Sequence, residues 1–221
     1  MAVDREEEKE YIAEKIAYAS GGPLSDYLDD LMTAGFISRN FTWSLKTGKP
    51  SRLSHYRLSD NYIRFYLKYI QPSMDRIERG QFQNISLSSL SGLDVFMGYQ
   101  FENLVLKNRE LIIHTLGIRS EEIVTENPFF QRKTKEQEGC QIDYLIQTKY
   151  GTLYVCEIKF SKNKIESSVI EQVQRKINRL KKPKGFSCRP VLIHINGTDE
   201  RLKESEFFDH IIDFSEFLTE G

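Results

Sequence analysis

Two short segments near the middle of the chain are rich in β-branched and aromatic residues and are joined by a polar connection. These segments, residues 141–146 and 154–160, have the composition and spacing of two strands in a hairpin. Residues two apart on a strand share a face, so Glu157 and Lys159 should point the same way. Asp143, near the start of the first strand, should lie close to them. The pattern therefore predicts a cluster of charged side chains at one edge of a sheet.

Helical and strand patterns alternate through the rest of the C-terminal half. Apolar residues at helical spacing predict one long helix over 93–114, ended by Gly117, and an amphipathic helix over 164–180. The compact apolar runs 190–195 and 211–214 predict buried strands. Strands interleaved with helices define an α/β fold of about 125 residues.

The N-terminal region has a different order of elements. Two helices, predicted over 11–17 and 24–34, precede two strands over 36–39 and 56–58. A polar, basic loop containing Gly and Pro, residues 46–52, separates the strands. This order is typical of a winged helix-turn-helix, in an incomplete form that begins at its second helix.

The charges of this module do not favour simple readout of DNA by the second of these two predicted helices. That helix, over 24–34, contains three aspartates and no Lys or Arg, which opposes contact with phosphate. The loop is basic, and Lys46, Lys49 and Arg52 are the residues that we expect to contact a nucleic-acid backbone. Two interpretations stay open: a module that packs against protein, and a weak clamp on DNA.

These patterns predict three parts along the chain. Residues 1–75 form the winged-helix-like module and residues 93–221 form the α/β domain. The stretch between them, 76–92, is rich in Ser towards its end and closes with Gly, as expected of a linker.

The net charge of the 221-residue chain is −1, so no global field attracts nucleic acid. Any binding to DNA must come from local patches. The densest basic stretch runs over 159–184 and includes Lys162 and Lys164, which we expect to contact phosphates. A solvated helix face is the alternative explanation for such charges.

Cysteine usage and hydropathy restrict the class of protein further. The three cysteines are widely spaced, which argues against structural zinc and against a disulfide framework. No apolar run is long enough to span a bilayer, and no signal peptide is recognisable. We therefore expect no membrane partner and a cytoplasmic location.

The charged residues of the central hairpin resemble the PD-(D/E)XK nuclease superfamily. Its core carries an Asp, then Glu-x-Lys on the next strand, with a Glu on a preceding helix, and Asp143, Glu157, Lys159 and Glu102 match these positions. The resemblance implies that Asp143, Glu157 and Glu102 coordinate Mg²⁺ or Mn²⁺. It also implies that Lys159 orients the attacking water or stabilises developing charge. Ile142 stands where the family carries Pro.

Over most of its length, the chain also resembles the C-terminal region of archaeal and bacterial STAND-type AAA ATPases. There, a winged helix and an uncharacterised domain related to PD-(D/E)XK nucleases follow the nucleotide-binding domain. The segments 24–37, 56–66 and 142–160 carry the resemblance. It implies an AAA-type ATPase domain as a partner, although the residues that would bind ATP are absent from this sequence.

Three hypotheses about function follow. The first is a Mg²⁺-dependent nuclease that hydrolyses phosphodiester bonds of DNA. The second is a catalytically inactive module that binds DNA or protein and regulates an ATPase domain absent from this chain. The third is a docking fold in which Asp143, Glu157 and Lys159 form only a salt bridge on a solvated face.

Overall fold

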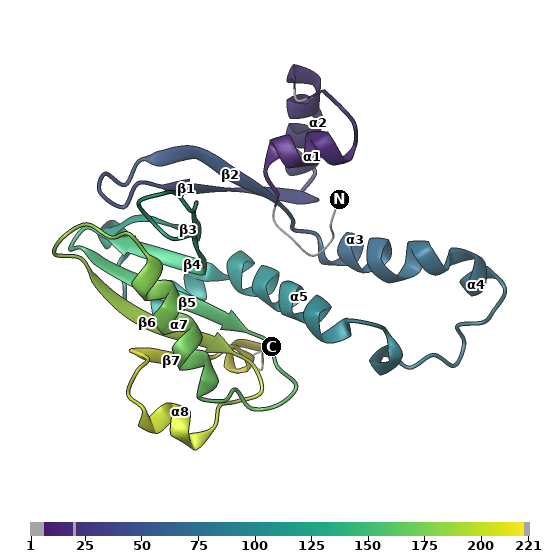
Figure 1. Ribbon diagram of the computed structural model, residues 1–221. Coiled ribbons are helices and arrows are strands. Elements are labelled where there is room, and N and C mark those ends of the chain that lie inside the picture. Colours follow the sequence, from purple (N-terminus) through teal and green to yellow (C-terminus); the bar gives the residue numbers. More distant parts are fainter. Residues whose placement is uncertain (1–6, 20, 219–221) are drawn as a thin grey trace. The chain divides into compact units, whose positions relative to one another are not determined.

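The computed structural model describes residues 7–19 and 21–218, and these residues form two compact units (Figure 1). The first unit consists of Met1–Asn40 and Leu53–Gln100, and the second of Phe41–Arg52 and Phe101–Gly221. Three elements therefore run from one unit into the other. They are β1 (Ile37–Trp43) and β2 (Pro50–Leu58), which pair into a two-stranded sheet, and helix α5 (Leu93–Lys107).

The first unit is mainly helical. Its helices are α1 (Lys9–Lys15), α2 (Gly22–Thr33), α3 (Asn61–Phe65) and α4 (Met74–Glu78), with π- and 3₁₀-helical turns at Tyr66–Ile70, Gln71–Ser73 and Leu87–Ser89. Pro23 lies in the first turn of α2, where a missing N–H costs nothing. The side chain of Asp60 caps α3 by accepting a hydrogen bond of 2.6 Å from the Ile63 N–H. Local sequence signals thus explain where these helices begin.

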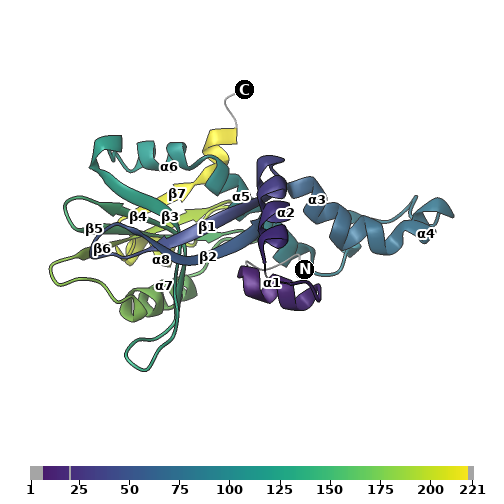
Figure 2. The same ribbon diagram turned by 90° about the horizontal axis from the view of Figure 1, so that it is seen from above.

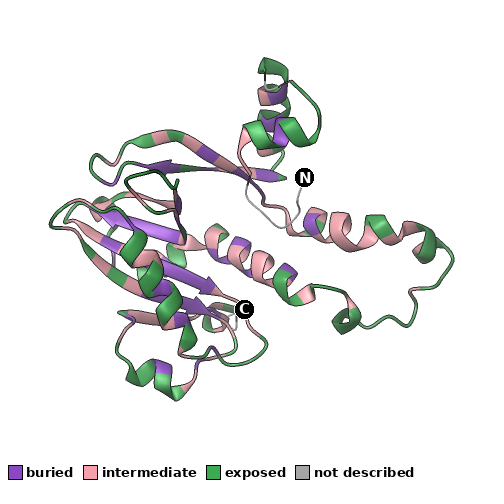
Figure 3. Ribbon diagram, in the orientation of Figure 1, coloured by how far each residue is buried: buried purple, intermediate pink, exposed green. Residues whose placement is uncertain are grey.

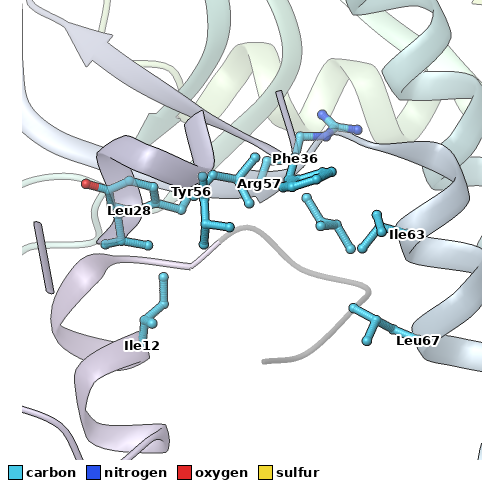
Figure 4. Close-up of a pocket in the computed structure, with 10 residues that line it drawn as sticks. Ile12, Leu28, Phe36, Tyr56, Arg57, Ile63 and Leu67 are labelled. Atoms are coloured by element: carbon cyan, nitrogen blue, oxygen red, sulfur yellow. The ribbon is translucent and has the colours of Figure 1, made fainter. Parts of the chain in front are cut away.

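An apolar core joins α1 and α2 to the base of the β1–β2 hairpin. Ile12, Leu28 and Tyr56 are buried there. A cavity of about 210 Å³ opens among these side chains, and its exposed lining is apolar (Figure 4). The order helix, helix, hairpin agrees with the order expected from the sequence, and the assignment as a winged helix stays a prediction.

The second unit contains a five-stranded mixed sheet. Its strands are β3 (Ile123–Gln131), β4 (Cys140–Thr148), β5 (Thr152–Lys159), β6 (Ser187–His194) and β7 (His210–Asp213), and they neighbour one another in this order. The pairs β3–β4 and β4–β5 are antiparallel, whereas β5–β6 and β6–β7 are parallel. The α/β class predicted from the sequence is confirmed. Strand β3 was not predicted, because Glu126, Asn127 and Pro128 interrupt its apolar pattern.

Helices cover both faces of this sheet. The remaining helices are α6 (Arg109–Thr115), α7 (Ser168–Arg179) and α8 (Glu200–Glu204), with 3₁₀ turns at Ser120–Glu122 and Phe214–Leu218. Figure 2 shows α6 and α7 on opposite sides of the strands. The central strands are accordingly buried, while much of α7 is exposed (Figure 3). No helix in the two described ranges is long and apolar enough to cross a lipid bilayer.

Two helix predictions were wrong at their boundaries. The long helix expected over 93–114 is divided between α5 and α6 at Asn108, whose side-chain amide donates to the Leu104 carbonyl at 2.8 Å. This bond competes with regular helical pairing. Helix α7 begins at Ser168 rather than at 164, because the Ile165 N–H donates to the Gly197 carbonyl at 3.0 Å.

The tip of the β1–β2 hairpin is part of the core of the second unit. Trp43 and Leu45 are buried in a cluster with Phe129 and the apolar residues of β4 and β5. The Trp43 indole N–H donates to Gln147 Oε1 at 2.7 Å, and Gln147 Nε2 donates to the Leu45 carbonyl at 3.0 Å. The hairpin is thus held to β4 by apolar packing and by a buried, satisfied amide.

Replacing Trp43 with alanine should lower the free energy of unfolding by about 3–5 kcal/mol, because a large buried ring and a buried hydrogen bond are lost. The loss is to be measured by urea unfolding followed by circular dichroism. Phe41→Ala is the control, since this neighbouring ring is 39% exposed and its loss should cost less than about 1 kcal/mol. Equal losses in the two variants would contradict the importance of the Trp43 contact.

Candidate functional site

Three of the four predicted catalytic residues lie at one end of the sheet. Asp143 lies near the start of β4, and Glu157 and Lys159 lie at the end of β5. Because these strands are antiparallel, the start of one is next to the end of the other. Glu157 and Lys159 alternate with Cys156 and Ile158, which pack into the core on the α5 and α6 side. The charged side chains therefore point to the α7 side.

A β-bulge aims the side chain of Asp143. Asn127 pairs with Leu145 and Phe129 with Ile142, so two residues of β4 lie opposite the single residue Pro128 of β3. Pro has no N–H to donate to a neighbouring strand, and prolines inside sheets are found at such irregular positions. The bulge interrupts the regular alternation of side chains along β4 at Asp143.

Both carboxylate oxygens of Asp143 are engaged. Oδ2 accepts a hydrogen bond of 3.0 Å from the backbone N–H of Ile158, and Oδ1 accepts one of 3.1 Å from Lys176 Nζ. The first bond fixes the carboxylate to β5, next to Glu157. The second connects it to helix α7.

Glu157 is 2% exposed, which is unusual for a carboxylate. Its Oε2 lies 2.5 Å from Lys176 Nζ, and its Oε1 lies 2.9 Å from Lys159 Nζ. Burial of a charge is costly unless such partners are present. The interpretation of these residues as a salt bridge on a solvated face therefore does not describe Glu157.

Lys176 is the residue of this cluster that sequence reasoning missed, since it was noted only as one charge in a basic stretch. Its side chain is 26% exposed and reaches both carboxylates from α7. Burial lowers the pKa of Lys176, but Asp143 and Glu157 raise it by more, so that the pKa lies above its ordinary value. The sequence signal that could have identified Lys176 is its position three residues, or about one helical turn, after Val173, which is buried.

The backbone of Lys176 is anchored as well. The thiol of Cys140 donates to the Lys176 carbonyl at 3.3 Å, and burial raises the pKa of this thiol to about 11. Helix α7 is also held to the sheet by Val169 and Val173, which are buried. The position of the Lys176 backbone is therefore determined by both strand β4 and the packing of the helix.

Glu102 lies on α5 and is half-buried. Its neighbours on that helix, Phe101 and Val105, pack on the sheet face that carries Cys156. Within residues 7–19 and 21–218, no three His, Cys, Asp or Glu side chains are grouped closely enough to hold a metal ion. A role for Glu102 as a third metal ligand stays a prediction.

The donor set formed by Asp143 and Glu157 nevertheless fits a divalent cation. One oxygen of each carboxylate lies within 3.1 Å of the same positively charged atom, Lys176 Nζ, so the gap between them already accommodates a cation. Carboxylate oxygens are the ligands that Mg²⁺ and Mn²⁺ prefer, and Mg²⁺ completes its shell with several waters. Two protein carboxylates can therefore begin a coordination shell that waters complete.

The five residues predicted to contact nucleic acid all lie in loops or strands of the second unit. Lys162 and Lys164 are exposed in the segment that follows β5. Lys46, Lys49 and Arg52 are exposed near the tip of the β1–β2 hairpin, Lys46 within its turn and the other two after it. Their role in binding stays a prediction.

Comparisons with known proteins find limited similarity, and no family model matches the chain. The chain is 32% identical over 83 residues to the uncharacterized protein MJECL04 of Methanocaldococcus jannaschii, a match that covers 37% of this chain and 18% of that protein. Among solved structures, it is similar to the crystal structure of a repair endonuclease from Pyrococcus abyssi. That similarity has 23% sequence identity and a TM-score of 0.34, and covers 51% of this chain and 44% of the other.

A buried histidine lies beside the cluster. His194 of β6 is the register partner of Lys159, is 3% exposed, and has no hydrogen-bond partner at Nδ1 among the residues that the structure describes. Burial lowers the pKa of His194, and the nearby Lys203 lowers it further, whereas Asp213 and Glu216 raise it. The net shift is downward, so folding favours the neutral ring.

Replacing Asp143 with alanine should lower the free energy of unfolding by about 1.5–3 kcal/mol, because Lys176 loses a partly buried partner and the Ile158 N–H loses its acceptor. Thermal or urea unfolding measures the loss. Glu136→Ala is the control: Glu136 forms a long ion pair of 3.9 Å with Lys181 and its side chain is 85% exposed. It should cost less than about 1 kcal/mol. Similar effects of the two substitutions would contradict the structural role of Asp143.

The pKa of His194 predicts how stability depends on pH. Because the folded-state pKa lies below that of the unfolded chain, the unfolded chain takes up the proton first. Stability should therefore fall as the pH drops below about 6.5 and through the folded-state pKa. His194→Gln should flatten this decline in urea unfolding curves recorded across that range. His114→Gln, at an exposed position on α6, should retain the decline of the wild type. An unchanged decline in the His194 variant would contradict the assignment.

Proposed function

We propose that the second unit is a metal-dependent nuclease domain that hydrolyses phosphodiester bonds of DNA. The observation that carries this proposal is the convergence of Asp143, Glu157 and Lys159 at one end of the sheet, with both carboxylates within 3.1 Å of one cationic nitrogen. Metal-assisted hydrolysis needs such an arrangement: acidic ligands for a cation, and a positive group beside them.

Each residue has a distinct role in this proposal. Asp143 and Glu157 would hold Mg²⁺ or Mn²⁺, and waters would complete the coordination shell. When bound, such an ion would lower the pKa of a water ligand and polarise a phosphoryl oxygen. Lys159 is held at 2.9 Å from Glu157 and is 33% exposed. Its ammonium can therefore orient the attacking water, or stabilise negative charge that develops on the phosphate.

The basic residues of the second unit supply a route for the DNA backbone. Lys162 and Lys164 follow directly from the strand that carries Lys159, and both are exposed. The hairpin that carries Lys46 and Lys49 is fixed by its own buried residues rather than projecting freely. Positive charges on a hairpin that is held in place can bind the phosphate backbone of DNA without reading its base sequence.

A specific observation also favours a second function. Asp143 and Glu157 already have two ammonium partners, so the formal charges of the cluster cancel without any metal. A nuclease-like domain stabilised in this way could serve as an inactive module that binds DNA or protein and regulates an AAA-type ATPase domain. The resemblance to the C-terminal region of STAND-type ATPases supports this alternative.

Substituting Glu157 with the isosteric glutamine should reduce cleavage of single- or double-stranded DNA in Mg²⁺ or Mn²⁺ by at least about 100-fold, because a metal ligand is lost. Release of labelled fragments measures cleavage, and a thermal unfolding curve establishes that the variant is folded. Glu166→Gln is the matched control, since Glu166 is exposed in the loop before α7. Its cleavage rate should equal that of the wild type.

Two outcomes would argue against the enzyme. Equal, weak cleavage by the wild type and the Glu157 variant would indicate a contaminant. Absence of cleavage, combined with DNA binding that does not depend on metal and survives Asp143→Asn, would support the regulatory module instead.

A further inference from the structure

Lys176 has no role in the chemistry proposed above, although it touches both central carboxylates. We infer that Lys176 is an internal counter-ion that competes with a divalent cation for Asp143 and Glu157, so that a metal ion binds only when its ammonium group leaves. This inference rests on the proposed metal-dependent function and adds a positioning residue to it.

The geometry makes the two cations mutually exclusive. Lys176 Nζ lies 2.5 Å from Glu157 Oε2 and 3.1 Å from Asp143 Oδ1. The other Asp143 oxygen is occupied by the Ile158 N–H, and the other Glu157 oxygen by Lys159. The two oxygens around Lys176 are therefore the ones through which a single ion would bridge both strands. Mg²⁺–oxygen distances are about 2.0–2.1 Å, which leaves no room for the ammonium group in the same gap.

The charges of the cluster also oppose simultaneous binding of Lys176 and a divalent ion. Two carboxyl groups and two ammonium groups form the cluster, and their formal charges cancel. A divalent ion entering this neutral cluster would bring like charges to within a few ångström of each other in a partly buried site. Departure of Lys176 removes the nearest of these repulsions and frees one oxygen on each carboxylate.

The side chain of Lys176 is built to move while its backbone stays. Its side chain is 26% exposed, and a four-carbon stem gives it several alternative rotamers. Its carbonyl is held by the Cys140 thiol, and Val173, one turn earlier, is fully buried. The displaced ammonium would stay at the mouth of the site near Lys159, where it adds a positive charge to the surface that meets phosphate.

The test is the affinity of the full chain for Mn²⁺ without DNA, measured from the electron paramagnetic resonance signal of free Mn²⁺. Lys176→Met should bind Mn²⁺ at least about tenfold more tightly than the wild type, since at least one charged hydrogen bond no longer has to be broken. Arg175→Met removes the same charge from the adjacent, exposed position of α7 and should change the affinity by less than about threefold.

Thermal unfolding gives a second readout that a merely structural lysine would not show. Without metal, Lys176→Met should unfold at a lower temperature, because two buried carboxylates lose a counter-ion. Saturating Mn²⁺ should raise its unfolding temperature by more than it raises that of the wild type. Lys176→Gln keeps a hydrogen-bond donor and provides the same comparison if the Met variant does not fold.

The outcomes separate this inference from the proposed function. If Asp143→Asn abolishes Mn²⁺ binding but the Lys176 variants bind no more tightly than the wild type, the metal site is real and the competition is wrong. If neither the wild type nor the Lys176 variants bind Mn²⁺, both the competition and the metal-dependent nuclease are overturned. Tighter binding in both Lys176 variants but not in the Arg175 variant supports the counter-ion.

Discussion

The burial of the Glu157 carboxylate beside Asp143 is the constraint on which the charged part of the second unit depends. Glu157 is almost completely buried, and a buried carboxylate without a partner would cost several kcal/mol. Lys159 supplies one partner from the same strand, at 2.9 Å, and Lys176 supplies a second, at 2.5 Å, because helix α7 lies against the face of β4 and β5 from which both acids project. The position of the helix and the burial of the charge are therefore two parts of one constraint.

The same sheet face has a second covering element. Away from the charged cluster, Trp43 and Leu45 of the hairpin tip pack on Phe129 and the strands beside it. Ile177 of helix α7 packs against this apolar cluster, and Leu180, directly after the helix, belongs to it. The face is thus divided into an apolar part, stabilised by non-directional burial, and a charged part, whose geometry is set by hydrogen bonds.

This division suits the exchange of cations inferred above. An apolar, closely packed region is insensitive to local charge, so movement of a single lysine head group need not disturb it. The bulge at Asp143 and the bond to the Ile158 N–H hold one carboxylate in place independently of Lys176. A preorganised set of acids with a removable internal cation is consistent with both proposed functions, which differ in whether a metal ever replaces the lysine.

The sequence by itself determined the class of fold and three of the four residues of the charged cluster. Alternating residues identified β4 and β5, and period two placed Glu157 and Lys159 on one face, because these relations depend only on local geometry. Strand β3 escaped detection, since Pro128 and its polar neighbours hide a strand that exists through its pairing with β4. Only the tertiary structure decided that Lys176, 19 residues after Glu157, supplies a positive partner for the buried carboxylate, because proximity across a helix and a sheet is not periodic in sequence.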